Sequence, residues 1–79
     1  MRSEFTVYIV EDDDSVRKAT SRLFRTDGLS VVAFASSDEF LDYPLADQIG
    51  CVLLDYRLPG LSGIDVQETL RSRGVSLPI

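Results

Sequence analysis

The sequence predicts an α/β protein with a doubly wound parallel sheet. Two apolar runs each end in acidic residues: Val7–Val10 precede Glu11–Asp14, and Cys51–Leu54 precede Asp55. Continuous apolar runs of this length are typical of strands buried on both faces of a parallel sheet. Helical patterns alternate with such runs along the chain, which implies right-handed crossovers and helices on both faces of the sheet.

The first part of the chain predicts a strand, a helix and a second strand. Residues 5–10 are apolar and β-branched, and residues 31–34 form a second short run of this kind. Between them, Asp13 or Asp14 can cap a helix, because a short carboxylate accepts hydrogen bonds from the free N–H groups at a helix start. Gly28 is placed to end that helix. The apolar residues at helical spacing predict the face by which this helix packs, and they are Val16, Ala19, Leu23 and Phe24. Basic residues cover the rest of the helix, namely Arg17, Lys18, Arg22 and Arg25.

The middle of the chain predicts a short helix and a third strand. Ser36–Glu39 has the capping-box spacing, with a serine followed by a glutamate three residues later. We therefore expect a helix over residues 37–43, which Pro44 prevents from continuing. The third strand is expected over residues 52–55.

The last part predicts a loop, a third helix and the start of a fourth strand. Pro59 and Gly63 belong to the loop, and Asp65 begins a helix that Gly74 ends. The apolar residues of this helix are Ile64, Val66 and Leu70. A fourth strand is expected to begin at Leu77–Ile79.

The composition excludes several classes of function. A net charge of −5 over 79 residues disfavours binding to DNA or RNA, which needs a basic face. The absence of histidine removes histidine-based catalysis and metal ligation, and a single cysteine excludes an internal disulfide. Because Cys51 lies in an apolar run, we expect a small buried residue rather than a reactive thiol. No run approaches the ~18 residues of a membrane span and no signal-peptide pattern is present, so the expected location is the cytoplasm.

The acidic residues at the strand ends suggest a metal site. If the first and third strands are neighbours, Glu11, Asp12 and Asp55 meet at the carboxyl edge of the sheet, where open α/β sheets bind ligands. Two unit charges ~4 Å apart repel by about 4 kcal/mol at an effective dielectric constant near 20, and a divalent cation removes this penalty. Oxygen ligands with retained water suit Mg²⁺, which can be shared with a phosphoryl group. Asp55 can then be a ligand alone or the nucleophile that forms an acyl phosphate.

Simpler interpretations are open for each acidic feature taken alone. Acidic residues after a strand are often helix caps, and Asp14, with Asp13 as the second candidate, is expected to be a cap even if Glu11 and Asp12 bind a metal. An aspartate before a Pro/Gly loop, such as Asp55, can be an ordinary turn residue. The two features together, on consecutive parallel strands, are more specific than either one.

Two motifs resemble the receiver domain of bacterial two-component response regulators. In Val7–Asp13 an acidic pair follows a strand, and in Leu53–Gly63 an aspartate after a strand is followed by a proline four residues later and by a glycine that opens the third helix. The resemblance covers about Thr6 to Ile79, and it is greatest to receivers attached to a LuxR-type helix-turn-helix output. It implies a flavodoxin-like fold and a role in phosphorelay signal transduction and transcription regulation.

By position, the resemblance implies a role for each acidic residue. Asp55 is expected to be the phosphoacceptor for a sensor histidine kinase, which makes the chain a signalling phosphoprotein and not an enzyme. Glu11 and Asp12 are expected to bind Mg²⁺ together with Asp55, and the backbone carbonyl of Arg57 completes the protein ligands. Glu11 stands where many members of the family have aspartate.

The family fold has five strands and five helices, so residues 1–79 are expected to be the N-terminal part of a receiver domain without an output domain. Pro59 and Gly63 are expected to shape the loop that holds the Arg57 carbonyl. The family's Ser or Thr after strand four and Lys after strand five are missing, so we expect weak phosphorylation without a working switch. We also expect the incomplete sheet to be marginally stable, or to form a homodimer through shared or swapped strands. A membrane is not an expected partner.

Two rival interpretations use the same residues differently. A Mg²⁺-dependent aspartyl-phosphate phosphatase of the haloacid-dehalogenase type has two aspartates two residues apart after strand one. Glu11-x-Asp13 imitates that motif poorly and leaves Asp55 without a role. A non-phosphorylated scaffold of the same fold does not need all three acidic residues.

Overall fold

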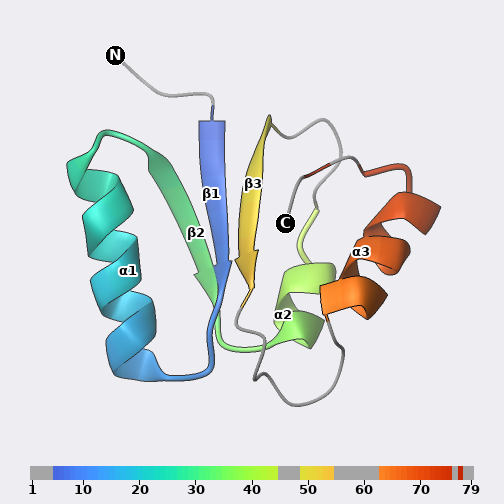
Figure 1. The fold of residues 1–79 in the computed structure, drawn as a ribbon, viewed down its shortest axis with the longest axis horizontal. Coiled ribbons are helices and arrows are strands. Elements are labelled where there is room, and N and C mark those ends of the chain that lie inside the picture. Colours follow the sequence, from blue (N-terminus) through green and yellow to red (C-terminus); the bar gives the residue numbers. More distant parts are fainter. Residues whose placement is uncertain (1–4, 45–48, 55–62, 76, 78–79) are drawn as a thin grey trace.

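The computed structural model describes residues 5–44, 49–54, 63–75 and Leu77. Their elements follow the predicted order of alternating strands and helices (Figure 1). They are β1 Phe5–Val10, α1 Asp14–Thr26, β2 Ser30–Phe34, α2 Ser37–Leu41, β3 Ile49–Leu54 and α3 Gly63–Ser72. The predicted site residues Asp55 and Arg57 and the loop residue Pro59 lie outside the described residues.

The three strands form a parallel sheet in the order β2-β1-β3. β1 lies in the middle, so that Val10 has Phe34 as its partner on one side and Leu54 on the other. Val7 to Val10 are each at most 1% exposed, which confirms the predicted burial of this strand on both faces. The parallel sheet and the adjacency of the first and third strands are also as predicted.

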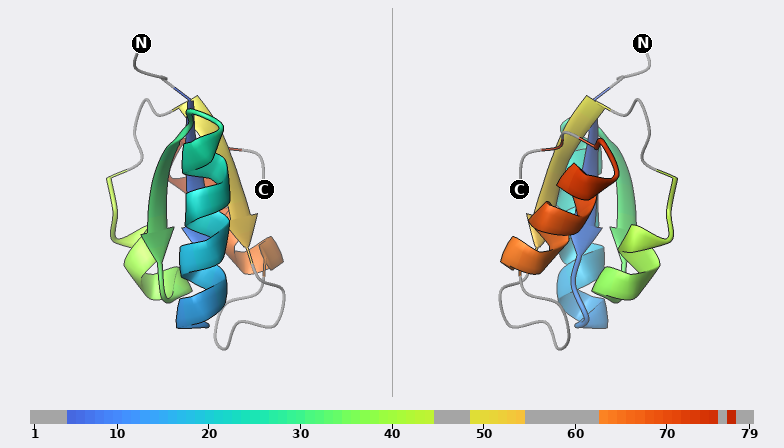
Figure 2. Two further views of the ribbon diagram at one scale, coloured as in Figure 1. Left: turned by 90° about the vertical axis from the view of Figure 1, so that its left-hand side faces the viewer. Right: turned by 90° about the vertical axis from the view of Figure 1, so that its right-hand side faces the viewer.

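The helices lie on both faces of the sheet. α1 packs against β2 and β1 on one face, and α2 and α3 lie on the other face (Figures 1 and 2). The carboxyl ends of the strands point to the lower edge of Figure 1, where α1 begins. Arg73, just after α3, ties the two helices of the second layer together, because its Nη1 donates a 2.5 Å hydrogen bond to the carbonyl oxygen of Leu41 in α2. Within the described ranges, no helix is both long and apolar enough to cross a membrane.

The main hydrophobic core lies between the sheet and the layer formed by α2 and α3. Four aromatic rings pack there with paired centroids 5.4–6.1 Å apart, namely Tyr8, Phe34, Phe40 and Tyr43. Val66 and Leu70 of α3 are at most 2% exposed, whereas Ile64 is 69% exposed. Only part of the predicted apolar set of α3 therefore faces this core.

The packing face of α1 differs from the prediction. Val16 and Leu23 are 45% and 63% exposed, whereas Ser21 is 4% exposed and Phe24 is half-buried. The predicted packing face of Val16, Ala19 and Leu23 was therefore wrong, because the helix turns its Ser21 side toward the sheet. Helical spacing identifies an apolar stripe, but it does not say which neighbour is available to cover that stripe.

β3 is less buried than predicted. It begins at Ile49 and not at residue 52, because its first residues pair with Phe5 and with Thr6 of β1. Val52 is 2% exposed, but Leu53 is 39% exposed and Cys51 is only half-buried, so the predicted burial on both faces was wrong for this run. Cys51 and Leu53 lie on the face of the sheet that carries α1, and α1 lies mainly over the other two strands.

Hydrogen bonds at the helix starts follow the predicted signals. Asp13 is the N-cap of α1, since its Oδ1 accepts a 2.9 Å hydrogen bond from the N–H of Val16. Ser36 is the N-cap of α2, and its Oγ accepts a 3.2 Å hydrogen bond from the N–H of Glu39. Both are the residue types that accept hydrogen bonds from the free N–H groups of a first turn.

Gly28 and Gly74 end α1 and α3 as predicted. Both have a positive φ, 85° and 76°, and the N–H groups of each glycine and of the next residue bond to carbonyls of the preceding turn in the pattern of the Schellman motif. Two other helix boundaries differ by two residues, since α2 ends at Leu41 and α3 begins at Gly63. Such shifts are usual at helix ends.

Candidate functional site

The candidate site lies at the carboxyl edge of the sheet, where β1 and β3 end side by side. Val10 and Leu54 are partners in the parallel register, and each is the last residue of its strand. In the sequence, Glu11 follows Val10 and Asp55 follows Leu54. The strand order therefore brings the last residues of β1 and β3 together at one edge of the sheet, and Asp55 itself lies outside the described residues.

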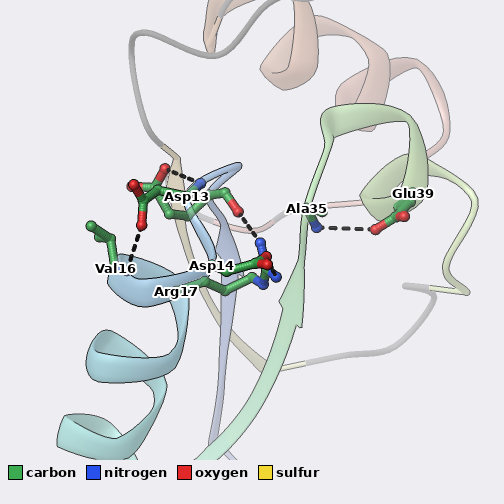
Figure 3. Close-up of polar contacts among 7 residues, drawn as sticks. Asp13, Asp14, Val16, Arg17, Ala35 and Glu39 are labelled. Carbon is green, nitrogen blue, oxygen red and sulfur yellow. Dashed lines mark hydrogen bonds and ion pairs between the residues drawn. The ribbon is translucent and has the colours of Figure 1, made fainter.

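Glu11 is a buried carboxylate that continues the line of β1. Its N–H donates a 3.0 Å hydrogen bond to the carbonyl oxygen of Phe34, so the ladder between β1 and β2 extends one residue beyond the strands. Only 8% of Glu11 is exposed, and its Oε2 accepts a 3.1 Å hydrogen bond from the N–H of Asp13 (Figure 3). This hydrogen bond holds the Glu11 carboxylate against the turn between β1 and α1.

Asp12 is exposed, in contrast to its neighbour Glu11. The two residues offer one buried carboxylate with a defined position and one carboxylate that faces solvent. Oxygen donors of this kind fit Mg²⁺, which prefers oxygen ligands and retains several waters. Within the described part of the chain, no three Asp, Glu, His or Cys side chains lie close enough together to hold a metal ion. A Mg²⁺ site at Glu11 and Asp12 would therefore need further ligands.

Asp13 and Asp14 serve the start of α1. The Asp13 carboxylate is occupied as the N-cap, which confirms the role predicted for it. Asp14 is the first residue of the helix and forms an ion pair with Arg17 one turn later (Figure 3). The cap role predicted for Asp14 was therefore wrong, because the backbone enters the helix one residue after Asp13. Among the four consecutive acidic residues, these two have helical roles, which separates them from Glu11 and Asp12.

Arg17 belongs to this site, although its position in the helical pattern predicted only that it covers the helix surface. Its Nη1 donates a 2.8 Å hydrogen bond to the carbonyl oxygen of Glu11, and its Nη2 binds the carboxylate of Asp14. The guanidinium group therefore holds the turn between β1 and α1 at both ends. The spacing of three residues between Asp14 and Arg17 could have predicted the ion pair. The hydrogen bond to the carbonyl of Glu11, six residues earlier, depends on the path of the backbone through the turn and could not be predicted in this way.

Glu39 lies at the same edge of the sheet, next to β2. Its Oε2 accepts a 3.0 Å hydrogen bond from the N–H of Ala35 (Figure 3). The N–H of Glu39 in turn donates a hydrogen bond to the Oγ of Ser36, the N-cap of α2. This is the predicted capping box with one difference, since the carboxylate reaches the residue before the N-cap. Glu39 is engaged with the backbone and is not assigned to the candidate metal site.

A hollow of about 240 Å³ adjoins Glu11 on the side of the sheet that carries α1. Its walls are mostly apolar and are formed by Ile9, Val10, Glu11, Thr20, Leu53 and Leu54. A charge beside such walls is less screened than one surrounded by water. A cation at Glu11 would therefore interact with this carboxylate more strongly than at an open surface.

Comparisons with known proteins agree with this fold. The family model "Response regulator receiver domain" matches residues 7–79. Nodulation protein W of Bradyrhizobium diazoefficiens is 48% identical over 73 residues, and the transcriptional regulatory protein TdiR of Thauera aromatica is 40% identical over 74 residues. These stretches cover 92% and 94% of this chain but 32% and 33% of the relatives, so the chain spans about a third of their length.

A solved structure shows the same likeness in three dimensions. The response regulator StyR superposes with a TM-score of 0.82 at 40% sequence identity, over 91% of this chain and 36% of the StyR chain. The parallel sheet order, the acidic turn after β1 and the family match support one assignment and confirm the resemblance seen in the sequence motifs. The chain belongs to the response regulator receiver domain family, the receiver modules of two-component response regulators.

Proposed function

We propose that this chain accepts a phosphoryl group on Asp55 from a sensor histidine kinase. In this proposal Mg²⁺ is held by the carboxylates of Glu11, Asp12 and Asp55 and by the backbone carbonyl of Arg57. The chain acts as a phosphoacceptor in a signalling relay and not as an enzyme with a substrate of its own. We place this activity in the cytoplasm, and we propose transcription regulation as the output of the protein that contains the chain.

One observation carries the proposal, namely the register that pairs Val10 with Leu54 at the ends of adjacent parallel strands. It brings the residue before Glu11 next to the residue before Asp55. In an open α/β sheet, ligands bind at this carboxyl edge. Acidic residues that follow adjacent strands at the same level are well placed to share one cation.

The two described carboxylates differ in a way that supports a Mg²⁺ site. Glu11 is buried and its orientation is set by the N–H of Asp13, whereas Asp12 faces water. This combination provides a fixed oxygen ligand and an open side where the ion keeps its waters and meets a phosphate. When bound, Mg²⁺ would neutralise the charge of the incoming phosphoryl group.

The proposed transfer is a displacement at phosphorus. A carboxylate oxygen of Asp55 forms the new P–O bond while the P–N bond to the kinase histidine breaks, and the imidazole leaves with the electron pair of that bond. Residues 1–79 contain no histidine, so in this proposal the phosphohistidine lies outside them, on the kinase.

The rival assignment to a haloacid-dehalogenase-type phosphatase is not favoured. That motif needs a free second aspartate two residues after the first, at the position of Asp13. The carboxylate of Asp13 instead accepts the N–H of Val16 as the cap of α1. A scaffold without phosphorylation remains the second alternative, and the experiment below separates it from the proposal.

Incubation with acetyl phosphate and Mg²⁺, followed by intact-mass analysis, tests the proposal. We expect a single phosphoryl adduct that requires Mg²⁺ and is lost in Asp55→Asn. The matched control is Asp27→Asn, because Asp27 is an exposed aspartate at the far end of α1 and its variant should be labelled like the original chain. Labelling that persists in Asp55→Asn would refute the assignment, and absence of any adduct would favour the scaffold.

A further inference from the structure

A second hollow, larger than the one beside Glu11, lies between α1 and β2. Its volume is about 550 Å³, which is within the range of roughly 300–1,000 Å³ for small-molecule sites. Four of the residues that line it are basic, namely Arg17, Lys18, Arg22 and Arg25 of α1, and Ala33 contributes from β2. Apart from Arg17, none of these residues has a role in the proposed phosphoacceptor site.

The hollow concentrates positive charge on an acidic protein. Four of the eight Lys and Arg residues of the chain line it, although the net charge of the chain is −5. Arg17 is already bound to Glu11 and Asp14. The side chains of Lys18, Arg22 and Arg25 make no hydrogen bond or ion pair with any residue that the structure describes, and all three residues are exposed.

The three unpaired cations stand on one side of the helix. Lys18, Arg22 and Arg25 are separated by four and three residues, so they are neighbours along α1. Like charges at this spacing destabilise a helix. An anion bound among them would remove that repulsion, which makes this face of α1 more stable with a ligand than without one.

The side chains that line the hollow favour one class of ligand, an anion that carries phosphate groups. Guanidinium groups bind phosphate oxygens through two parallel hydrogen bonds, and a lysine adds a point charge. Ser21 also lines the hollow, and its hydroxyl has no hydrogen-bond partner in the described ranges. Among the residues that the structure describes, no aromatic side chain lines the hollow, so these residues offer a nucleobase no ring to stack on. We propose that this hollow binds a small anion with several phosphate charges and without a base, such as a polyphosphate or a multiply phosphorylated metabolite.

Isothermal titration calorimetry with sodium tripolyphosphate at low salt tests this site. The titration is done with EDTA and without Mg²⁺, so that the candidate metal site does not contribute. We expect binding that weakens as salt increases. In the double variant R22Q/R25Q the affinity should fall by roughly tenfold or more, since a hydrogen bond to a charged group contributes enough for such a change.

Arg71→Gln is the matched control, because Arg71 lies in the last turn of α3 as Arg25 lies in the last turn of α1. Its affinity for tripolyphosphate should equal that of the original chain. Glutamine is a good helix former, and circular dichroism checks that the variants keep their helices. Amide NMR shifts induced by tripolyphosphate should be largest near Ser21 and Ala33 and should be the same in Asp55→Asn.

Three outcomes would overturn the proposal. The first is no binding of tripolyphosphate at low salt, and the second is equal binding by R22Q/R25Q and the original chain. The third is tighter binding of an oligoglutamate peptide than of tripolyphosphate, which would assign the hollow to an acidic protein partner.

Discussion

The Nη1 of Arg17 donates a 2.8 Å hydrogen bond to the carbonyl oxygen of Glu11. This bond joins the first turn of α1 to the residue that follows β1. The same guanidinium group also pairs with Asp14, so one side chain holds both ends of the turn that carries the acidic residues.

We expect Arg17→Met to lower the free energy of unfolding by about 1 kcal/mol. A hydrogen bond to a charged group contributes about 1.5–3 kcal/mol, and partial exposure of the ion pair reduces this value. Methionine keeps the aliphatic part of the side chain. Urea unfolding followed by circular dichroism measures the change, and Arg22→Met, one turn further on, is the control. Equal losses for the two variants would contradict the role given to Arg17.

Glu11→Gln should weaken Mg²⁺ binding roughly tenfold or more, because it removes a charged oxygen ligand. Glutamine has the same size, and its amide oxygen can still accept the N–H of Asp13, so the turn should keep its shape. Calorimetric titration with MgCl₂ measures the affinity, and Asp27→Asn controls for the loss of one negative charge. Unchanged Mg²⁺ affinity in Glu11→Gln would remove this residue from the ligand set.

The free energy of unfolding should fall at high pH, because the hydroxyl of Tyr8 is buried and then ionises. Burial raises the pKa of its hydroxyl above the usual value near 10, and the nearby Tyr43 adds to the rise, while a hydrogen bond with Thr6 opposes it. The folded state therefore holds this proton more tightly than the unfolded state. Its stabilising contribution is complete below about pH 10 and is lost as the pH rises through the pKa of the folded state.

Tyr8→Phe isolates this contribution. Urea unfolding at about pH 9 and about pH 11 should show a smaller loss of stability for the variant than for the original chain. Equal losses would show that other groups cause the alkaline destabilisation.

Gly50 should tolerate no side chain. A Cβ at this position would lie 1.8 Å from the carbonyl oxygen of Thr6 in the neighbouring strand. We expect Gly50→Ala to destabilise the fold by about 3 kcal/mol, because the two strands must move apart. Gly28→Ala is the comparison, since a Cβ there meets nothing and only the positive φ is unfavourable, at about 1 kcal/mol. Similar losses in the two variants would contradict a steric role for Gly50.

The chain should self-associate as its concentration rises. Ile49 and Leu53 of β3 are 58% and 39% exposed, and exposed apolar surface of this kind favours contact with another copy. Size-exclusion chromatography with light scattering over a dilution series measures the mass, and Leu53→Lys should shift the distribution toward monomer. A monomer at every concentration would rule out this association.

Local signals predicted the order of the elements and most of the helix ends. Asp13, Ser36, Gly28 and Gly74 are at the positions expected of caps, because capping depends on hydrogen bonds within a few residues of the chain. The acidic residues after the first and third strands were recognised for a similar reason, since an apolar run and the residue that follows it are adjacent in sequence.

Other features depend on contacts between distant segments and were missed. The early start of β3 at Ile49 results from pairing with Phe5, which lies more than forty residues earlier in the chain. The bond from Arg17 to the Glu11 carbonyl and the burial of Ser21 in place of Leu23 depend on how α1 lies over the sheet.

The sequence by itself determined the parallel α/β architecture, the family and the acidic residues that could form a site. These properties could be predicted because the periodicity of strands and helices, the helix caps and the acidic residues that follow a strand depend on residues that are neighbours in the sequence. Only the tertiary structure decided that Val10 and Leu54 end side by side, that Glu11 is buried while Asp12 is exposed, and that three unpaired cations of α1 line a hollow. These properties arise when elements far apart in the chain pack together, and packing selects one face of each element for burial.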